Sequence, residues 1–409
     1  MATAEWKPAK LDELGFVGRG KSRHRPRDAA FLYGGRYPFF QTGDIKAANF
    51  HLTKYRQTYS EEGLAQSKLW KPGTLCITIA ANIAESAILG IEGCFPDSVV
   101  GFVADPEKAD VRFVKYYMDT LKIEMQSVSR GTTQDNLSLE KLLAFDFRVP
   151  PLPVQRQIAG ILSAYDELME NSQRRIRILE AMARTLYREW FVHFRFPGHE
   201  KLARVASPLG DIPQGWEVKT LADVADVNRA QIKADTAPDE LHYIDISSVS
   251  PGQIDTITTY AFADAPGRAR RIVQHGDVLW SCVRPNRCSH AQVMHPEPDT
   301  IASTGFAVLT ARKVPFTFLY FTTTTDDFVA YLTNSATGAA YPAITAATFE
   351  KADLLIPSAS SLKKFGEVTI PMAEQIHTLQ RQIQDLRRTR DLLLPRLLSG
   401  QQLLNPLDP

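Results

Sequence analysis

A long stretch near the middle of the chain, residues 153–190, places apolar residues at alternating steps of four and three. This spacing is the a/d seam of a coiled-coil helix, and the opposite face carries charged residues, as a solvent-facing side would. At 1.5 Å per residue such a helix would be roughly 55 Å long. The seam consists of Ile158, Leu162, Tyr165, Met169, Ser172, Ile176, Leu179, Ala183, Leu186 and Trp190.

A second stretch, residues 371–400, repeats this spacing near the C-terminus. A long helix with a single apolar seam needs a partner, so we expect the two helices to pair with each other. Arg390 is a polar exception on the second seam, and we expect it either to weaken the pair locally or to bond a polar residue across it. The apolar seam positions are Ile376, Leu379, Ile383, Leu386, Leu393 and Leu397.

The two segments that precede these helices have similar sequence patterns, as two copies of one unit would. Each has short apolar runs separated by Gly, Pro and polar turns, which favours strands, and each has one helix candidate, 111–128 or 316–334. A repeat period near 200 residues indicates domain duplication and not a solenoid. The matches are Trp6, Leu11, Leu14 and Arg19 with Trp216, Leu221, Val224 and Arg229; Asp44-Ile45 with Asp245-Ile246; KPGTLCI from Lys71 with QHGDVLW from Gln274; Val100-Gly101-Phe102 with Thr304-Gly305-Phe306; and 129–150 with 336–357.

We therefore predict an α/β (α+β) protein with two homologous globular domains, 1–150 and 208–358. The segment 151–207 contains the long helix 153–190 and a linker, and the C-terminal segment 359–409 contains the second long helix, 371–400. Because the two halves are equivalent, the helices should pair as an antiparallel coiled coil about an internal pseudo-two-fold axis.

Composition limits the possible functions of the chain. With 409 residues, 44% of them apolar, and a net charge of +1, it should form two to three domains, and any nucleic-acid-binding patch must be local. Four cysteines form no CxxC pair and have no histidine at zinc-ligand spacing, so we expect reduced, mostly buried thiols. No run approaches the roughly 18 apolar residues of a membrane span, and no signal-peptide core is visible, so we expect a cytoplasmic protein.

The histidines indicate no catalytic or metal site. His193, His199, His275, His290 and His295 form no HxxxH or HExxH motif, and each is more typical of an ordinary surface or core residue. We expect no catalytic residue, no metal and no cofactor bound by this chain.

One motif offers an alternative function. Gly15–Ser22 matches G-x-x-x-x-G-K-S, the phosphate-binding P-loop, which works only between a buried strand and a helix. The preceding KPAKLDEL is polar, Pro26 would interrupt a following helix, and the second copy, ADVNRAQI, lacks the motif glycines and the lysine. A nucleotide-dependent enzyme is kept as the alternative, and a coiled-coil scaffold without DNA binding as a third hypothesis.

Basic residues gather on loops in both copies. Clusters of this kind suit phosphate contacts, and arginine can also bind guanine through two hydrogen bonds, although a single basic run is more often only a solvated loop. A cluster in each copy favours DNA binding. The candidates are Arg19, Lys21, Arg23, Arg25 and Arg27 in the first copy, and Arg229, Arg268, Arg270, Arg271, Arg284 and Arg287 in the second.

Two further loops precede the last strand of each copy, SRGTTQDN and SATGAAYP. They combine glycine with hydroxyl and amide side chains, and the amides of Gln134 and Asn136 have the donor–acceptor edge that pairs with adenine. An ordinary turn is an equally good interpretation. The candidates here are Arg130, Thr132, Thr133, Gln134, Asn136, Thr337 and Tyr341.

Three stretches resemble a known family. Residues 150–194 resemble the central conserved region of the specificity subunit of Type I restriction-modification enzymes, and LGDIPQGWEVKTLADV (209–224) resembles the start of that family's second target-recognition domain. RDLLLPRLLSG (390–400) resembles its C-terminal conserved helix. The resemblance covers nearly the whole chain and is weakest inside the two globular domains.

The resemblance implies a non-catalytic DNA-recognition subunit in the prokaryotic cytosol. Each target-recognition domain would read one half of a bipartite, asymmetric site in double-stranded DNA. The helices would set the spacing and dock two modification subunits, which are methyltransferases, and restriction subunits would join to translocate and cut DNA. S-adenosylmethionine, ATP and Mg would then be bound by the partner subunits.

Overall fold

The computed structural model describes residues 6–129, 136–233, 235 and 237–400. The chain forms two compact units, the first from residues 1–173 and 381–409, and the second from 174–380. Each unit therefore combines a globular part with a portion of both long helices. No helix in the described part of the chain is long and apolar enough to cross a membrane.

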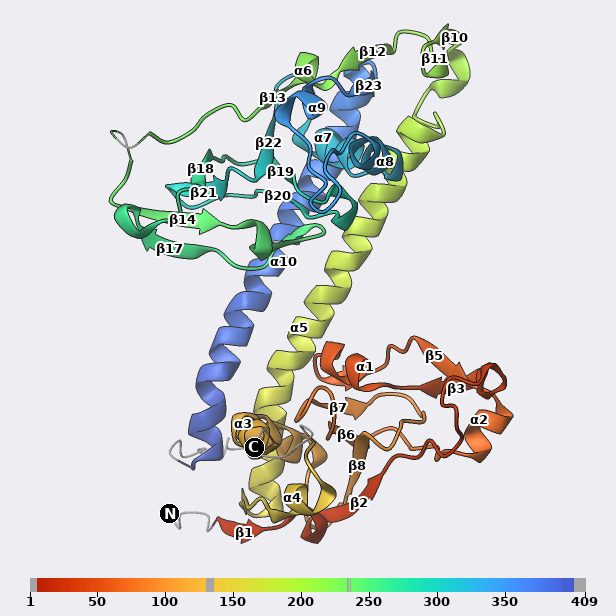
Figure 1. The fold of residues 1–409 in the computed structure, drawn as a ribbon, viewed down its shortest axis with the longest axis vertical. Helices are drawn as coiled ribbons and strands as arrows, with labels where there is room; N and C mark the ends of the chain where they lie inside the picture. Colours follow the sequence, from red (N-terminus) through yellow and green to blue (C-terminus); the bar gives the residue numbers. More distant parts are fainter. Residues whose placement is uncertain (1–5, 130–135, 234, 236, 401–409) are drawn as a thin grey trace, which may run out of the picture. The chain divides into compact units, whose positions relative to one another are not determined.

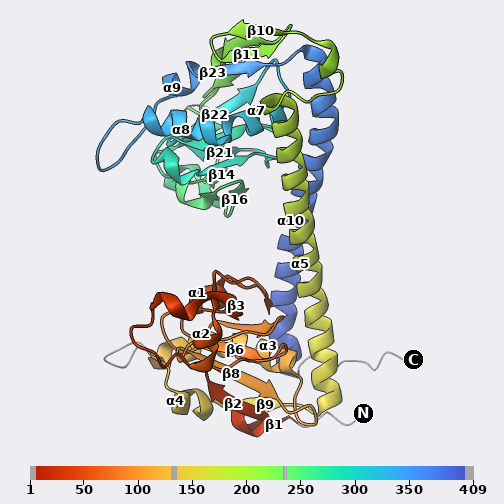
Figure 2. The same ribbon diagram turned by 90° about the vertical axis from the view of Figure 1, so that its right-hand side faces the viewer.

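The first unit is built on a five-stranded sheet with the order β2-β8-β6-β7-β4, of which Figure 2 labels β2, β8 and β6. Alternate residues of β6 face opposite sides: Leu75 and Ile77 pack with Phe113 of α3, whereas Cys76 packs with Phe40 and its neighbours. The strands of this sheet are β2 (Gly15–Arg19), β4 (His51–Leu52), β6 (Leu75–Thr78), β7 (Ser86–Leu89) and β8 (Val99–Ala104).

Smaller elements complete the first unit. Two two-stranded pairs, β1–β9 and β3–β5, flank the main sheet. The expected helix 111–128 is present as α3, one residue longer. The elements are β1 (Lys7–Ala9), β3 (Tyr33–Phe39), β5 (Gln57–Tyr59), β9 (Phe147–Val149), α1 (Thr42–Ala47), α2 (Glu61–Ala65), α3 (Val111–Ser129) and α4 (Leu139–Ala144).

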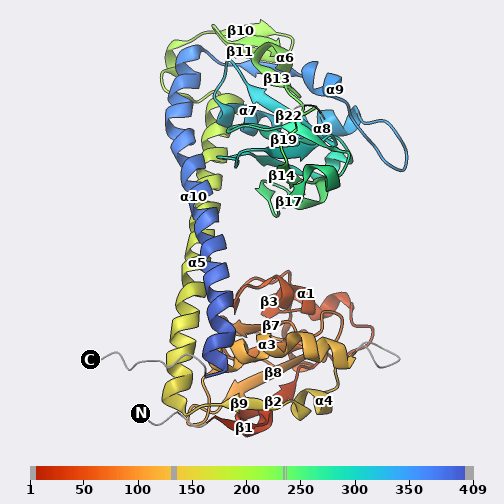
Figure 3. The ribbon, with the colours of Figure 1, turned by 90° about the vertical axis from the view of Figure 1, so that its left-hand side faces the viewer.

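The second unit has two four-stranded sheets, β13-β22-β19-β20 and β17-β14-β21-β18; Figure 3 labels β13, β22 and β19 of the first and β14 and β17 of the second. Its remaining strands form the pairs β10–β11, β12–β23 and β15–β16. The strands are β10 (Arg204–Ser207), β11 (Gly210–Pro213), β12 (Glu217–Thr220), β13 (Ala225–Val227), β14 (Glu240–Ile244), β15 (Val249–Ser250), β16 (Gln253–Ile254), β17 (Thr258–Ala261), β18 (Ala269–Ile272), β19 (Val278–Ser281), β20 (His290–Gln292), β21 (Thr300–Ser303), β22 (Phe306–Ala311) and β23 (Asp353–Ile356).

The helix expected at 316–334 is divided in two. It breaks at Thr324-Thr325, because the Thr325 hydroxyl accepts the Phe328 N–H and thereby caps a new helix. The short helices of this unit are α6 (Leu221–Val224), α7 (Phe316–Thr323), α8 (Asp326–Asn334) and α9 (Ala346–Glu350).

The repeat in the sequence is also a repeat of topology. The order β2-β8-β6-β7 in the first unit corresponds to β13-β22-β19-β20 in the second, and β1–β9 corresponds to β12–β23. Gly73 and Gly276, each at the turn before the central strand, have φ angles of 86° and 87°, a backbone region that other residues rarely adopt.

One expected match in the repeat is wrong by three residues. Phe102 lies opposite Val17 and Leu75, and the residue opposite their counterparts, Val227 and Val278, is Leu309. Phe102 therefore corresponds to Leu309 and not to Phe306. The shared Gly-Phe dipeptide suggested the other alignment, but strand pairing decides which positions are equivalent.

The two long helices are α5 (Leu152–Tyr187), which continues into a π-helical turn at Arg188–Val192, and α10 (Ala359–Leu398) (Figure 1). Within the first unit, Ile158 and Leu162 of α5 share a core with Leu397 and Leu398 of α10. The buried seam residues are Ile158, Leu162, Met169, Ser172, Ile176, Ala183, Leu379, Ile383 and Leu397. The half-buried ones are Tyr165, Leu179, Leu186, Trp190, Ile376, Leu386 and Leu393.

Helix α10 begins twelve residues before the expected start at Pro371. Ser358 provides the N-terminal cap, since its hydroxyl accepts the Ser361 N–H at 3.3 Å. Pro371, the expected start, lies in the interior of the helix.

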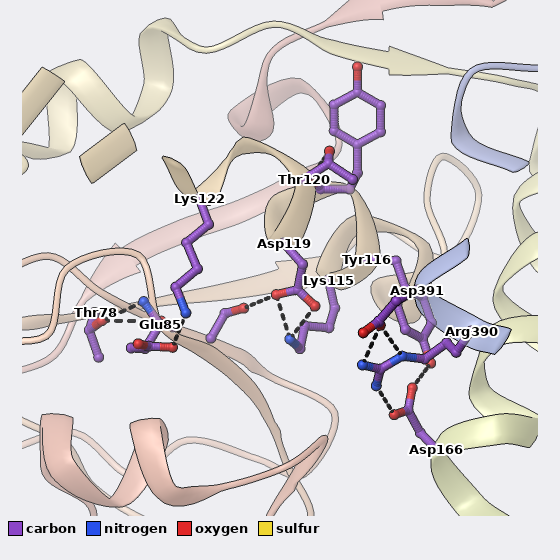
Figure 4. A network of polar contacts seen from close by, with 12 residues as sticks. Thr78, Glu85, Lys115, Tyr116, Asp119, Thr120, Lys122, Asp166, Arg390 and Asp391 are labelled. Carbon is purple, nitrogen blue, oxygen red and sulfur yellow. Dashed lines mark hydrogen bonds and ion pairs between the residues drawn. The ribbon is translucent and has the colours of Figure 1, made fainter. Parts of the chain in front are cut away.

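Arg390 bonds a polar residue across the seam (Figure 4). Its guanidinium donates to the carboxylate of Asp166 on α5, whose other oxygen accepts the Tyr116 hydroxyl at 2.5 Å. Asp166 is 2% exposed, and burial raises the pKa of its carboxyl despite these partners. The Arg390 guanidinium also donates a hydrogen bond to the carboxylate of Asp391, so it bonds two carboxylates.

Candidate nucleic-acid interface

Gly15–Ser22 is not a phosphate-binding loop. Its first five residues are strand β2, paired antiparallel with β8, and no helix follows. The N–H groups of Gly20 and Lys21 donate to the carbonyls of Val99 and Phe95, at 2.9 and 3.1 Å. The backbone amides that would surround a phosphate in a P-loop are thus already used, and a nucleotide-dependent enzyme has no support.

Part of the first basic cluster lines an open groove, together with one of the candidate loops. Arg19, Arg27, Asn136 and Lys141 lie around this hollow, and Asp97 lies among them. Asp97 holds both arginines: its carboxylate accepts two bonds from Arg27, at 2.9 and 3.0 Å, and its carbonyl accepts the Arg19 Nε–H at 3.1 Å. We call this set the first-unit groove. Sequence reasoning missed Lys141, because it lies on α4, away from any basic run.

The other basic residues of the first cluster lie outside the groove lining. Lys21, Arg23 and Arg25 are exposed, and the Arg25 guanidinium folds back to donate to the carbonyls of Ser22 and His24. The Arg23 N–H is held by the Gln66 side chain. This loop is consequently anchored to the rest of the unit, and it leaves Lys21 and Arg23 exposed to solvent.

Lys68 adds a further cation that the sequence did not single out. Its Nζ lies 3.6 Å from the centroid of the Trp70 ring and 4.6 Å from that of Phe16. Partial burial, and secondarily the charge of Lys21, lower the pKa of this lysine. An ammonium that lies over aromatic rings and beside another cation is well suited to accept a phosphate as a partner.

Four of the loop candidates cannot be placed. Arg130, Thr132, Thr133 and Gln134 lie outside the described residues. Asn136 is placed: its backbone pairs with Ala80 at the end of β6, and the next residue, Leu137, donates to the Ile79 carbonyl at 2.9 Å.

We call the place where this loop bonds to the end of the central strand the junction. The second unit has an equivalent junction with different side chains. Ala343 pairs with Val283, and the Ile344 N–H donates to the Cys282 carbonyl at 2.9 Å, at the end of β19. Arg284 extends from the junction over the ring of Tyr341, 4.7 Å from its centroid, and donates to the Ala340 carbonyl. Tyr341 is 70% exposed and thus offers a free aromatic face.

Arg287 and Thr337 are exposed residues of the same region. Arg287 ends the short 3-10 turn Pro285–Arg287, which is flanked by Arg284 and Cys288 at φ angles of 51° and 53°. Non-glycine residues in the left-handed conformation at both ends of a turn are strained. Such strain is concentrated at functional sites.

The remaining candidate arginines of the second unit lie in strand β18 or in the loops that precede it. Arg229 bonds Gln274 at 2.8 Å, Arg270 lies over the Phe262 ring, and Arg268 is exposed. Arg271 is half-buried, and its pKa is lowered by burial, an unusual state for a guanidinium. The structure therefore brings together Arg284 and Tyr341, but it gives Arg229 and Arg270 local partners of their own.

The two junctions have the same chemistry. Each offers arginine donors with an amide or aromatic side chain, beside the end of the central strand. Guanidinium groups neutralise phosphates, and amide edges or aromatic faces contact bases. This combination suits a nucleic acid better than a small molecule.

Comparisons with known proteins agree with the geometry. The family described as Type I restriction modification DNA specificity domain matches residues 3–181. The Type I restriction enzyme MjaIX specificity subunit of Methanocaldococcus jannaschii is 23% identical, with 97% of this chain and 93% of that protein aligned. The HindI specificity subunit of Haemophilus influenzae is 20% identical over 68% of this chain and 73% of its own length.

A solved structure has the same fold. The S subunit of a Type I restriction-modification system from M. genitalium superposes with a TM-score of 0.64 over 97% of each chain, at 15% identity. The predicted mixed α/β fold with long helices is thereby confirmed. The chain is thus similar to Type I restriction-modification specificity subunits, through the domain match over residues 3–181 and through relatives aligned over nearly its whole length.

Proposed function

We propose that this chain recognises a bipartite, asymmetric site in double-stranded DNA, with each globular domain reading one half. The domains are 1–150, which contains the first-unit groove, and 208–358, which contains the Arg284–Tyr341 junction. Arginine and lysine contacts to phosphate supply most of the affinity, and a few side chains per domain read base edges.

The recurrence of one junction in both units carries the proposal. The bonds from Leu137 to Ile79 and from Ile344 to Cys282 fix equivalent loops against equivalent strands. The scaffold is thus conserved between the copies, whereas the side chains it presents differ: Arg19, Arg27 and Asn136 in one, Arg284 and Tyr341 in the other. Two different side-chain sets on one scaffold are what the reading of two different half-sites requires.

The long helices serve, in this proposal, as spacer and as docking surface. Two modification subunits bind their outer faces and carry S-adenosylmethionine, and restriction subunits carry ATP and Mg. The complex works in the prokaryotic cytosol. The chain itself is the recognition subunit and contributes specificity, not catalysis.

The experiment compares DNA binding by two variants of the full chain, assembled with its modification subunits. Arg19→Ala with Arg27→Ala removes two groove cations, and we expect binding to weaken at least tenfold. The slope of log K against log salt should fall by about 2, since each phosphate contact releases about one counterion. Fluorescence anisotropy measures both quantities, with a duplex that carries the bipartite site identified by methylome sequencing of the host.

The matched control is Arg148→Ala with Arg156→Ala, which removes two exposed arginines of the same unit outside the groove. It should leave the salt slope unchanged. If both double variants weaken binding equally, the groove is not the DNA contact.

A further inference from the structure

Two histidines of the second unit are brought together by the pairing of β19 with β20. His275 lies in the turn before β19, and His295 follows the end of β20. The Gly276 N–H donates to the Val293 carbonyl, and the Val293 N–H donates to the Asp277 carbonyl, both at 2.8 Å. These bonds place the two imidazole rings side by side, with centroids 4.3 Å apart and planes tilted by 41°.

A glutamate of α10 contacts both rings. One carboxylate oxygen of Glu374 lies 2.7 Å from His295 Nε2, and the other lies 3.6 Å from His275 Nε2. Potential ligand atoms of the three residues all lie within 4.8 Å of one another. His377, one turn further along α10, has its ring centroid 5.4 Å from that of His295.

The set has the composition and spacing of a metal site. Two imidazoles and a carboxylate are the three-ligand set of many zinc sites, and Glu-x-x-His on one helix is a recurrent ligand pair. In a tetrahedral site with ligand distances near 2.1 Å, neighbouring ligand atoms are roughly 3.4 Å apart. The observed separations bracket that value, so small side-chain movements suffice to bring the three groups onto one ion.

Two other observations fit an ion and not a simple ion pair. His295 has a φ of 43°, a left-handed backbone conformation that costs free energy in a non-glycine residue. The binding of an ion would compensate for that cost. The histidines also line an open hollow beside Val273 and Pro296, through which an ion could enter.

We propose that His275, His295 and Glu374 bind a divalent transition metal ion, with Zn²⁺ as the best match, and that the ion fastens the globular part of the second unit to α10. The fourth position is taken by water or by His377. The site lies apart from the Arg284–Tyr341 junction, and the role is structural, so the proposal does not depend on how DNA is read.

Titration of the EDTA-treated full chain with ZnCl₂ tests the proposal. Isothermal calorimetry should show one strong site, and the melting temperature should rise with zinc concentration. With Co²⁺ in place of zinc, the visible spectrum should show the intense d–d bands of a tetrahedral ion without a thiolate charge-transfer band.

His275→Ala with His295→Ala should weaken zinc binding about a hundredfold and abolish the rise in melting temperature. The matched control is His193→Ala, which removes another exposed histidine that contacts a glutamate, Glu189 at 4.0 Å. Circular dichroism of both variants without metal confirms that they fold.

Two results would overturn the proposal. The wild-type chain could bind no zinc below millimolar concentrations. Alternatively, the double variant could bind zinc as tightly as the wild type, with a thiolate band in the Co²⁺ spectrum that would place the ion on cysteines.

Discussion

At the scale of single residues, the ring of His290 shows how burial fixes a charge state. It lies 4.8 Å from the Trp280 ring and 5.7 Å from the Tyr320 ring, centroid to centroid. Burial, with a smaller contribution from the charge of Arg184, lowers the pKa of His290 to about 4. Within the described residues its Nδ1 has no hydrogen-bond partner. The imidazole is therefore neutral at physiological pH.

This pKa predicts acid sensitivity of the second unit. The unfolded chain binds a proton at His290 below about pH 6.5, whereas the folded chain does so only below about pH 4. Between these values the unfolded state holds more protons, so stability falls as pH falls, by about 1.4 kcal/mol per pH unit.

His290→Gln should remove this dependence. Urea unfolding of wild type and variant at pH 7, 6, 5 and 4.5 would give a stability difference that shifts in favour of the variant as pH falls. A difference that stays constant with pH would show that His290 does not titrate in this window.

The sequence identified basic residues more readily than it identified their orientation. In the sequence, Arg19, Arg25 and Arg27 are members of one basic run and cannot be told apart. Only the fold reveals that Asp97 turns Arg19 and Arg27 into the groove, while Arg25 bonds its own backbone. Asp97 is 70 or more positions away along the chain, so no local pattern could have indicated this.

At the scale of elements, the pair of α5 and α10 in the first unit contains one buried charge pair, between Asp166 and Arg390. A buried ion pair adds little net stability compared with apolar packing, but removal of one partner leaves an unpaired charge. Because the pair fits in a single alignment of the two helices, we infer that it fixes their register.

Arg390→Met should therefore destabilise the first unit by about 3 kcal/mol, as the Asp166 carboxylate keeps only the Tyr116 hydroxyl. Addition of Asp166→Asn should recover much of this loss, since the neutral amide still accepts that hydroxyl. Urea unfolding measures both variants.

Asp391→Asn is the control, because Asp391 is exposed and its bond to Arg390 should contribute less than about 1 kcal/mol. An Arg390→Met variant as stable as the wild type would mean that other groups or water stabilise the Asp166 carboxylate. The ion pair would then not contribute to the stability of the first unit.

Helix existence was predictable from the sequence, but helix boundaries and distant contacts were not. The seam spacing identified both long helices because apolar periodicity extends over many turns. The start of α10 was misplaced because the regular apolar seam begins only at Ile376, whereas the helix is capped much earlier, at Ser358. The histidines at 275 and 295 looked unrelated, since strand pairing and a helix almost 80 residues further on bring them to Glu374.

At the scale of the whole molecule, both units contain part of α5 and part of α10. If the helices measure the distance between half-sites, lengthening both should change the gap alone. Insertion of one heptad after Gln173 and one after Gln380 keeps both seams in register and adds about 10.5 Å of helix. That length corresponds to about three base pairs at 3.4 Å each.

We therefore expect a recognised site with the same two half-sites and a gap about three base pairs longer. Methylome sequencing of cells that carry the variant and its partner subunits would read both features. The control has the same residues inserted after Gly198, in the segment between α5 and β10, where the gap should not change. Altered half-sites with an unaltered gap would contradict the role of the helices as spacer.

The core of the first unit has a consequence for protein synthesis. Leu393, Leu394, Leu397 and Leu398 complete it, yet the ribosome makes them only after all 207 residues of the second unit, 174–380. At 5–20 residues per second this delay is roughly 10–40 s. During that interval the nascent first unit exposes the apolar side chains around Ile158 and Leu162 that the late helix will cover. Chains that stop early lack these leucines, so their apolar core residues stay exposed.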